Sequence, residues 1–192
     1  MAAIGMQYPV WAPLTSDTGN AQTYGTGMVV GRAVSANLSW SREDNELYGD
    51  DAVAETDNSL TGYTLDIATT ELTETVEAAL LGYVAVGSTD EYEVTDDNSP
   101  YGGFGYIRVL KRNGTKLYKA FWYPKIQFSM NSESDNTKQK TTNWGTPTIN
   151  GKGLAVFNDA TGKQKFRQQK AFTTLAAAKA YLNTKAGISS NG

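Results

Sequence analysis

The sequence of 192 residues contains neither histidine nor cysteine. Without cysteine the chain has no disulfide, no thiol nucleophile and no thiolate ligand for zinc. Without histidine it cannot build a Ser-His-Asp triad, and it lacks the side chain that changes charge near neutral pH at its ordinary pKa. An enzyme made from this sequence is left with carboxylates, lysines and tyrosines for acid–base chemistry.

Long apolar runs and a strong positive charge are also missing. No apolar run approaches the roughly 20 residues that a membrane-spanning helix needs, so we expect no membrane contact. The first residues lack a cationic segment followed by an apolar one, so we expect no signal peptide and synthesis in a cytoplasm. The net charge of −3 is opposite in sign to the basic character of a typical nucleic-acid-binding domain.

The residues that are abundant favour a mainly β fold. Nineteen glycines, together with many Thr, Ser and Asn residues, indicate numerous turns. The apolar fraction of 40% is enough for a buried core at this length. We therefore expect one domain over residues 1–192.

Alternation of apolar and small polar residues predicts a strand over residues 34–41. We expect the charged loop 41–45 to turn the chain back into a second strand at 46–48, and residues 50–59 to form an acidic loop. A further alternating strand follows at 62–67. These four segments predict a hairpin, a loop and a strand in succession.

Two helices are predicted. Residues 73–81 carry one apolar stripe, with Thr70 as the expected N-cap and Gly82 as the expected stop. The Ala-rich residues 174–182 predict a second, C-terminal helix, and we expect the chain from Asn183 onward to be mobile.

The clearest hairpin signal is Asn113-Gly114, which predicts a tight turn between strands 104–111 and 115–123. Pro124 favours an edge or a bend in the strand that follows. Residues 1–25 show no sustained period, so we expect an N-terminal arm.

Some residues suit binding chemistry but also have simpler explanations. The turns Asp50-Asp51 and Asp96–Asn98 offer oxygen ligands for Ca²⁺ but lack the spacing of an EF-hand, so solvated acidic turns are the simpler interpretation. Trp122, Tyr123 and Trp144 suit a sugar-stacking platform, although packing in a core or an interface is the commoner role of such aromatics.

Basic residues gather on the hairpin around Asn113-Gly114. A cationic surface there suits nucleic acid, the acidic loops of a neighbouring subunit, or simple solvation, and the acidic net charge favours the last two. The residues are Arg108, Lys111, Arg112, Lys116 and Lys119.

Five segments, taken in this order, resemble the major tail tube proteins of long-tailed, non-contractile bacteriophages (siphophages). They lie between about residue 30 and residue 157 and are Leu47–Asp51, Ala78–Gly82, Pro100–Tyr106, Tyr118–Lys125 and Thr146–Gly151. Residues 1–25 carry no such similarity, and residues 163–192 are typical of a variable C-terminal extension.

The resemblance implies a β-sandwich or half-barrel with one flanking helix and a short C-terminal helix. It also implies a virion structural protein, without enzymatic activity or cofactor, that forms stacked hexameric rings and so a conduit for DNA ejection. The implied partners are further copies of the chain, tail tip and terminator proteins, the tape measure protein inside the lumen, and double-stranded DNA in transient passage.

Two sets of residues become candidates under this resemblance. Small polar and acidic side chains opposite the apolar strand faces are expected to line the lumen without holding DNA, and they are Ser35, Asn37, Ser39, Glu46 and Asp66. Charged loop residues are expected at contacts between subunits or rings, and they are Arg42, Glu43, Asp44, Asp50, Asp51, Asp135, Lys138 and Lys140.

Three other functions compete with this interpretation. A β-sandwich binding or adhesin module would present exposed Trp or Tyr side chains to a carbohydrate or receptor. A hydrolase would need two carboxylates across a cleft. A secretion-system tube protein shares the general ring design.

Overall fold

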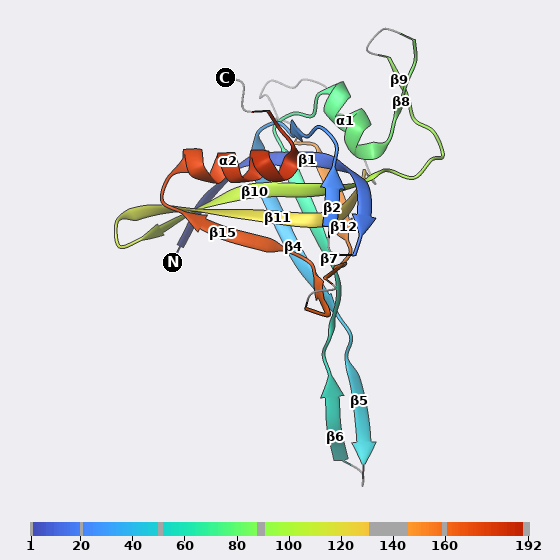
Figure 1. Ribbon diagram of the computed structural model, residues 1–192, viewed down its shortest axis with the longest axis vertical. Coiled ribbons are helices and arrows are strands. Elements are labelled where there is room, and N and C mark those ends of the chain that lie inside the picture. Colours follow the sequence, from blue (N-terminus) through green and yellow to red (C-terminus); the bar gives the residue numbers. More distant parts are fainter. Residues whose placement is uncertain are drawn as a thin grey trace, which may run out of the picture.

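The protein is mainly β in the part of the chain that its computed structural model describes, with antiparallel sheets and two helices, α1 and α2 (Figure 1). The helices are α1 Glu74–Leu81 and α2 Leu175–Ala186. The described residues are 2–19, 21–49, 52–87, 91–130, 146–158 and 161–189.

Nine strands of these segments form the main sheet, in the order β2-β1-β10-β11-β12-β7-β4, with β15 also paired to β11 and β3 to β1. The members of the main sheet are β1 Ala2–Thr18, β2 Ala21–Tyr24, β3 Met28–Val29, β4 Ala33–Arg42, β7 Leu60–Thr69, β10 Tyr101–Arg112, β11 Thr115–Ser129, β12 Thr148–Gly153 and β15 Gln168–Phe172. The remaining strands pair two by two, and they are β5 Asn45–Gly49 with β6 Ala52–Asp57, β8 Val84–Ala85 with β9 Tyr92–Glu93, and β13 Val156–Asn158 with β14 Lys163–Lys165.

Strand β11 joins two layers of the sheet. Along one edge it pairs with β10 from residue 115 to residue 127, and along the other it pairs with β15 over 118–122 and with β12 over 126–129. A register shift opposite Gly103 leaves Pro124 in a bulge, between the residues that pair with β15 and those that pair with β12. Proline has no N–H to donate, so a bulge accommodates it inside a sheet, as the predicted bend required. The steep strands β4 and β7 therefore cross the nearly horizontal β10 and β11 in Figure 1.

The main core lies between these layers. Tyr63, Leu65 and Ile67 of β7 are buried there against aromatic side chains of β10 and β11. The ring centroids of Tyr63 and Tyr123 are 5.1 Å apart. Burying an apolar side chain of this size contributes about 1.5–3 kcal/mol, so this aromatic layer is a major source of stability.

A second core lies between α2 and the outer face of β1, β10 and β11 (Figure 1). Ala178, Leu182 and Ala186 of α2 are fully buried there. Thr174 caps the helix by accepting a hydrogen bond from the N–H of Ala177. Residues 163–189 thus contribute β14, β15 and α2 to the fold. The expectation of a mobile chain from Asn183 is wrong for residues 183–186, which complete α2, and the Tyr8 hydroxyl donates to the Asn183 Oδ1 at 2.8 Å. Residues 190–192 lie outside the described residues.

The expected N-terminal arm is wrong as well. Residues 2–18 form β1, which pairs with β10 over most of its length. Val10, Trp11 and Ala12 are buried, since β1 lies between the main core and α2. A strand covered on both faces needs no alternation, and this explains why the segment has no period of two.

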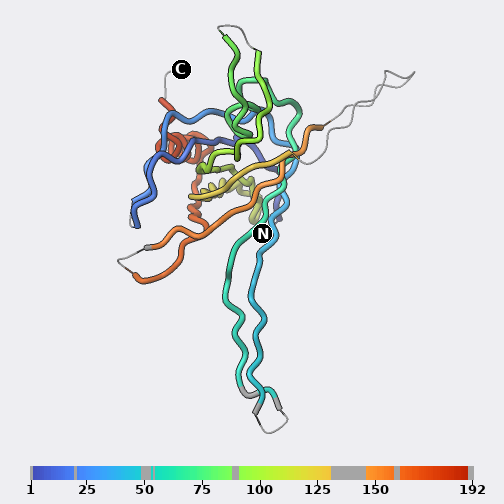
Figure 2. Tube along the Cα trace, turned by 90° about the vertical axis from the view of Figure 1, so that its right-hand side faces the viewer, coloured from blue at the N-terminus to red at the C-terminus, as the bar shows by residue number. Residues whose placement is uncertain are grey.

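The chain does not turn back at residues 41–45. Strand β4 pairs instead with β7, and the ladder continues through the Glu43 N–H to the Ser59 carbonyl into the pair β5–β6. The expected acidic loop at 50–59 thus contains strand β6. The outer part of this long ribbon projects from the body in two perpendicular views (Figure 1, Figure 2).

The predicted turn at Asn113-Gly114 and the predicted helix end at Gly82 are confirmed. Asn113 and Gly114 both have positive φ angles, 47° and 80°, as a tight hairpin turn requires. Helix α1 ends at Gly82, whose φ of 81° lies in the left-handed region. Its N-cap is Thr73 and not Thr70, whose N–H donates to the Arg32 carbonyl.

Gly153 provides a test of the packing between β12 and β7. A Cβ at this position overlaps the ring of Tyr63, which lies directly opposite on β7. Gly153→Ala should therefore lower the free energy of unfolding by about 1–3 kcal/mol through overpacking, measured by urea denaturation. Gly5→Ala is the control, because nothing lies within 4 Å of its Cβ. Equal unfolding midpoints for the two variants would contradict the packing.

Candidate functional site

The structure brings four of the five lumen candidates onto one surface. Ser35, Asn37 and Ser39 lie on β4, and Asp66 lies on β7 directly opposite Asn37. Side chains alternate along a strand, so these residues point away from the core that their neighbours fill. We call this surface the polar face, and its members are Ser35, Asn37, Ser39, Thr64, Asp66, Thr148, Asn150 and Lys152.

The polar face carries little net charge. Its two ionic side chains, Asp66 and Lys152, are opposite in sign. The Asn150 amide donates to the Asp66 carboxylate at 2.8 Å, across the β12–β7 pair. A surface of hydroxyls and amides presents no cluster of cations that would hold phosphates.

Glu46 does not belong to the polar face. It lies on β5, in the projecting ribbon, where its carboxylate accepts a hydrogen bond from the Tyr48 hydroxyl. The hydrogen bond to Glu46 raises the pKa of Tyr48. The alternation along β4 does not carry over to β5, because β5 pairs with β6 outside the main sheet.

The projecting ribbon is a second candidate surface. We call residues 43–57 the acidic ribbon, since they include seven acidic residues and no basic one. Leu47, Tyr48 and Val53 are exposed there, by 62%, 65% and 46%. A two-stranded hairpin is marginal in water, and apolar side chains left in solvent on it indicate a contact surface. These three residues were absent from the sequence-derived candidates.

The candidates for contacts between subunits fall on or beside this ribbon where the structure describes them. Arg42 ends β4, and Glu43 and Asp44 continue from it, all three exposed. Arg42 donates to the Asn58 carbonyl at 3.1 Å and so supports the base of the ribbon. The other five candidates lie outside the described residues, namely Asp50, Asp51, Asp135, Lys138 and Lys140.

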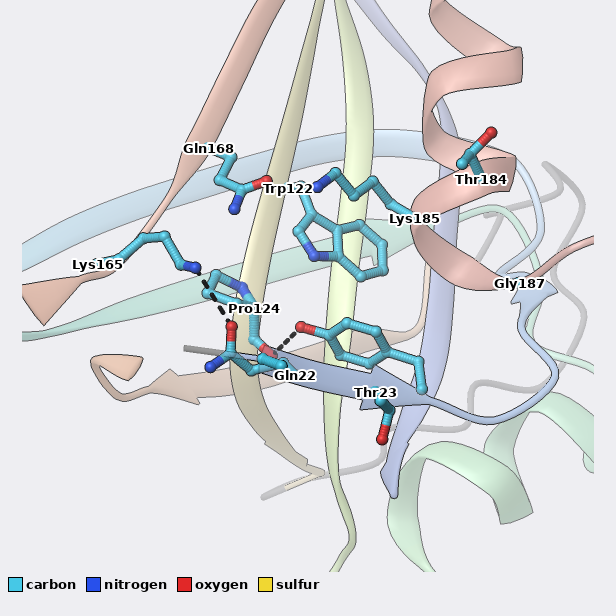
Figure 3. A pocket seen from close by; sticks show the side chains of 11 residues that line it. Gln22, Thr23, Trp122, Pro124, Lys165, Gln168, Thr184, Lys185 and Gly187 are labelled. Atoms are coloured by element: carbon cyan, nitrogen blue, oxygen red, sulfur yellow. Dashed lines mark hydrogen bonds between the residues drawn. The ribbon is translucent and has the colours of Figure 1, made fainter. Parts of the chain in front are cut away.

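A third feature is a surface pocket of about 560 Å³ between β2, β11 and the end of α2 (Figure 3). Tyr24 and Trp122 form its aromatic part, with ring centroids 5.2 Å apart. Lys165 and Lys185 also line it, and no carboxylate does so among the described residues. The Lys165 ammonium donates to the Gln22 amide oxygen at 3.2 Å. This chemistry suits an anion.

Burial in this pocket disfavours the charged forms of Lys185 and Tyr24. Burial, with a smaller contribution from the charge of Lys165, lowers the pKa of Lys185 below its ordinary value. Burial also raises the pKa of Tyr24 to about 12. A negative group entering the pocket would favour the charged form of Lys185 and so act against this lowering of its pKa.

The basic residues predicted on one hairpin do lie together. We call residues 108–119 the basic hairpin. Arg108 lies directly opposite Lys119, and Lys111 lies directly opposite Lys116. The Arg108 guanidinium and the Lys119 ammonium lie 5.0 and 5.4 Å from the centroid of the Phe121 ring. None of the five cations forms an ion pair with an acidic residue in the described segments.

The aromatic platform expected of a sugar-binding module is not formed by Trp122 and Tyr123. They are 1% and 0% exposed, and both pack in the cores. Trp144 lies outside the described residues. The described Asp and Glu residues form no group of three or more suited to a metal ion.

Comparison with protein-family models and with curated proteins finds no match for this chain. Neither described helix is long and apolar enough to cross a membrane. The polar face, the acidic ribbon and the basic hairpin are the surfaces of the described residues that suggest a role.

The pocket supplies a test through its two lysines. Lys165→Met should raise the pKa of Lys185, because it removes a nearby positive charge, while burial keeps that pKa below its ordinary value. The pKa is measured by NMR of ¹³C-methylated lysines across a pH titration. Lys163→Met, at an exposed position of β14, should leave it unchanged. An unaltered Lys185 in the Lys165 variant would contradict this geometry.

Proposed function

We propose that this protein is the structural subunit of a bacteriophage tail tube, which assembles into stacked hexameric rings. The acidic ribbon is the observation that carries the proposal. It reaches beyond the body by roughly 20 Å, at about 3.3 Å per residue from Arg42 to Gly49. A ribbon of this length contributes no residue to the described cores, so its role lies in contact with another molecule.

Assembly also suits the edges of the sheet. Strands β4 and β2 end the strand order in the described residues and leave backbone groups without a strand partner. Exposed edges invite pairing with other chains, and a closed ring of subunits removes them. In the proposed ring, edges of neighbouring copies meet, while the ribbon reaches the next ring.

The polar face is the proposed lining of the lumen. Ser35, Asn37, Ser39 and Asp66 would face the tape measure protein first and duplex DNA later, without the clustered cations that bind phosphates. The tail tip and terminator proteins are the further partners implied by this role, in a virion assembled in the host cytoplasm. The half-barrel form of the tail-tube fold belongs to the same proposal.

Removing the ribbon tests its role in assembly. Arg42 and Leu60 lie directly opposite each other, so an Asn-Gly turn can replace residues 43–59. The shortened chain should fold with nearly unchanged stability, because both cores are retained. It should stay unassembled at concentrations where the full chain forms rings or tubes, as seen by light scattering and negative-stain microscopy. Tubes from the shortened chain would contradict the proposal.

The polar face has a separate test. Asn37→Lys with Ser39→Lys adds two cations to it, so assembled tubes should form normally but retain duplex DNA. Retention is measured by co-sedimentation of labelled DNA with tubes at about 0.1 M salt. Ala176→Lys with Ala180→Lys, on exposed positions of α2, is the control. Equal DNA retention by both variants would place the lumen elsewhere.

A further inference from the structure

Opposite charges are segregated onto two separate hairpins of the chain. The acidic ribbon, residues 43–57, has seven acidic residues and no basic one. Residues 101–130, which include the basic hairpin, have six basic residues and no acidic one. The net charge of the whole chain is only −3, so this separation is a local property.

The two hairpins cannot neutralise each other within one molecule. In Figure 1 the acidic ribbon points downward, whereas the turn between β10 and β11 points to the left. No ion pair or hydrogen bond joins them among the described residues. Each hairpin therefore keeps its charge available for another molecule.

The basic hairpin bears an unfavourable arrangement of its own. Lys111 faces Lys116 and Arg108 faces Lys119 across the β10–β11 pair. Like charges directly opposite on neighbouring strands are destabilising. Carboxylates of a bound partner would turn this repulsion into attraction, so the arrangement favours an anionic partner.

Both surfaces also offer apolar side chains. Leu47 and Tyr48 are exposed on the ribbon, and Ile4 is 51% exposed on β1, beside Leu110 and Val109 of β10. A stable contact combines apolar anchors with charged groups around them. The two surfaces thus match in apolar character as well as in charge.

We propose that the acidic ribbon of one copy docks on the basic hairpin of a neighbouring copy. The contact is heterologous, because each copy presents its acidic ribbon to one neighbour and its basic hairpin to another. The contact therefore repeats from copy to copy. This inference rests on the proposed tube function and names the surface that receives the ribbon.

Duplex nucleic acid is the other polyanion that a basic hairpin could bind. The exposed apolar side chain of Ile4 beside the hairpin finds apolar partners in Leu47 and Tyr48 of a second copy, whereas a phosphate backbone offers it none. The observations therefore favour a second copy of this chain.

Paired charge reversals test the contact. The first variant is Glu46→Lys with Glu55→Lys, and the second is Lys111→Glu with Lys116→Glu. All four side chains are exposed, and the second variant keeps like charges opposite each other, so both variants should fold. Circular dichroism and thermal unfolding check that they do.

Each variant alone should self-associate at least about tenfold more weakly than the parent chain, because like charges now meet across the contact. An equimolar mixture should regain association. The acidic ribbon of the second variant then meets the basic hairpin of the first, and the new lysines of the first meet the new glutamates of the second. Analytical ultracentrifugation measures both effects, and the regained association should weaken as salt rises. Arg32→Glu with Lys163→Glu, at exposed positions outside both hairpins, should associate as the parent does.

Two results would overturn the inference: variants that assemble as the parent does, or a mixture that behaves as the sum of its parts. Duplex DNA binding by the parent that the second variant alone loses, without rescue on mixing, would assign the basic hairpin to nucleic acid instead. Tubes that form in every variant would refute this contact and leave the tube function standing. Association rescued on mixing, but never as rings or tubes, would refute the tube function and leave the contact.

Discussion

The register between β4 and β7 decides both what the protein buries and what it presents. With Asn37 opposite Asp66, the alternate positions Leu65 and Ile67 lie in the core, and the hydroxyls and amides of the polar face point outward. A slip of one residue would exchange the two faces and bury the polar side chains without partners. The acidic ribbon continues from the far ends of the same two strands, as the separate pair β5–β6.

The rest of the architecture holds this ladder in place. Strand β11 changes partners at the bulge around Pro124 and thereby connects the β4–β7–β12 layer to the layer under α2. Helix α2 then covers the far side of that second layer through Leu182 and its neighbours. On the outer surface of β4 and β7, Ser35, Asn37, Ser39 and Thr64 are exposed, as the proposed channel lining requires.

The features that the sequence predicts correctly are those set by residues close together in the sequence. The alternation in β7, the Asn113-Gly114 turn and the stop at Gly82 each follow from local geometry. Strand β1 was missed because burial on both faces removes its alternation, and β6 was missed because a strand outside the core needs no apolar pattern. The partner of β4, the separation of Glu46 from the polar face, and the pocket at Lys165 all depend on long-range pairing that no local pattern encodes.

A cryo-electron-microscopy reconstruction of the assembled protein tests the central claim most directly. The account predicts a hollow tube in which the polar face, with Asn37 and Asp66, lines the channel, and the acidic ribbon of each subunit contacts a subunit of the next ring. An assembly whose channel is lined by α2, or whose ribbons extend freely into solvent, would contradict it.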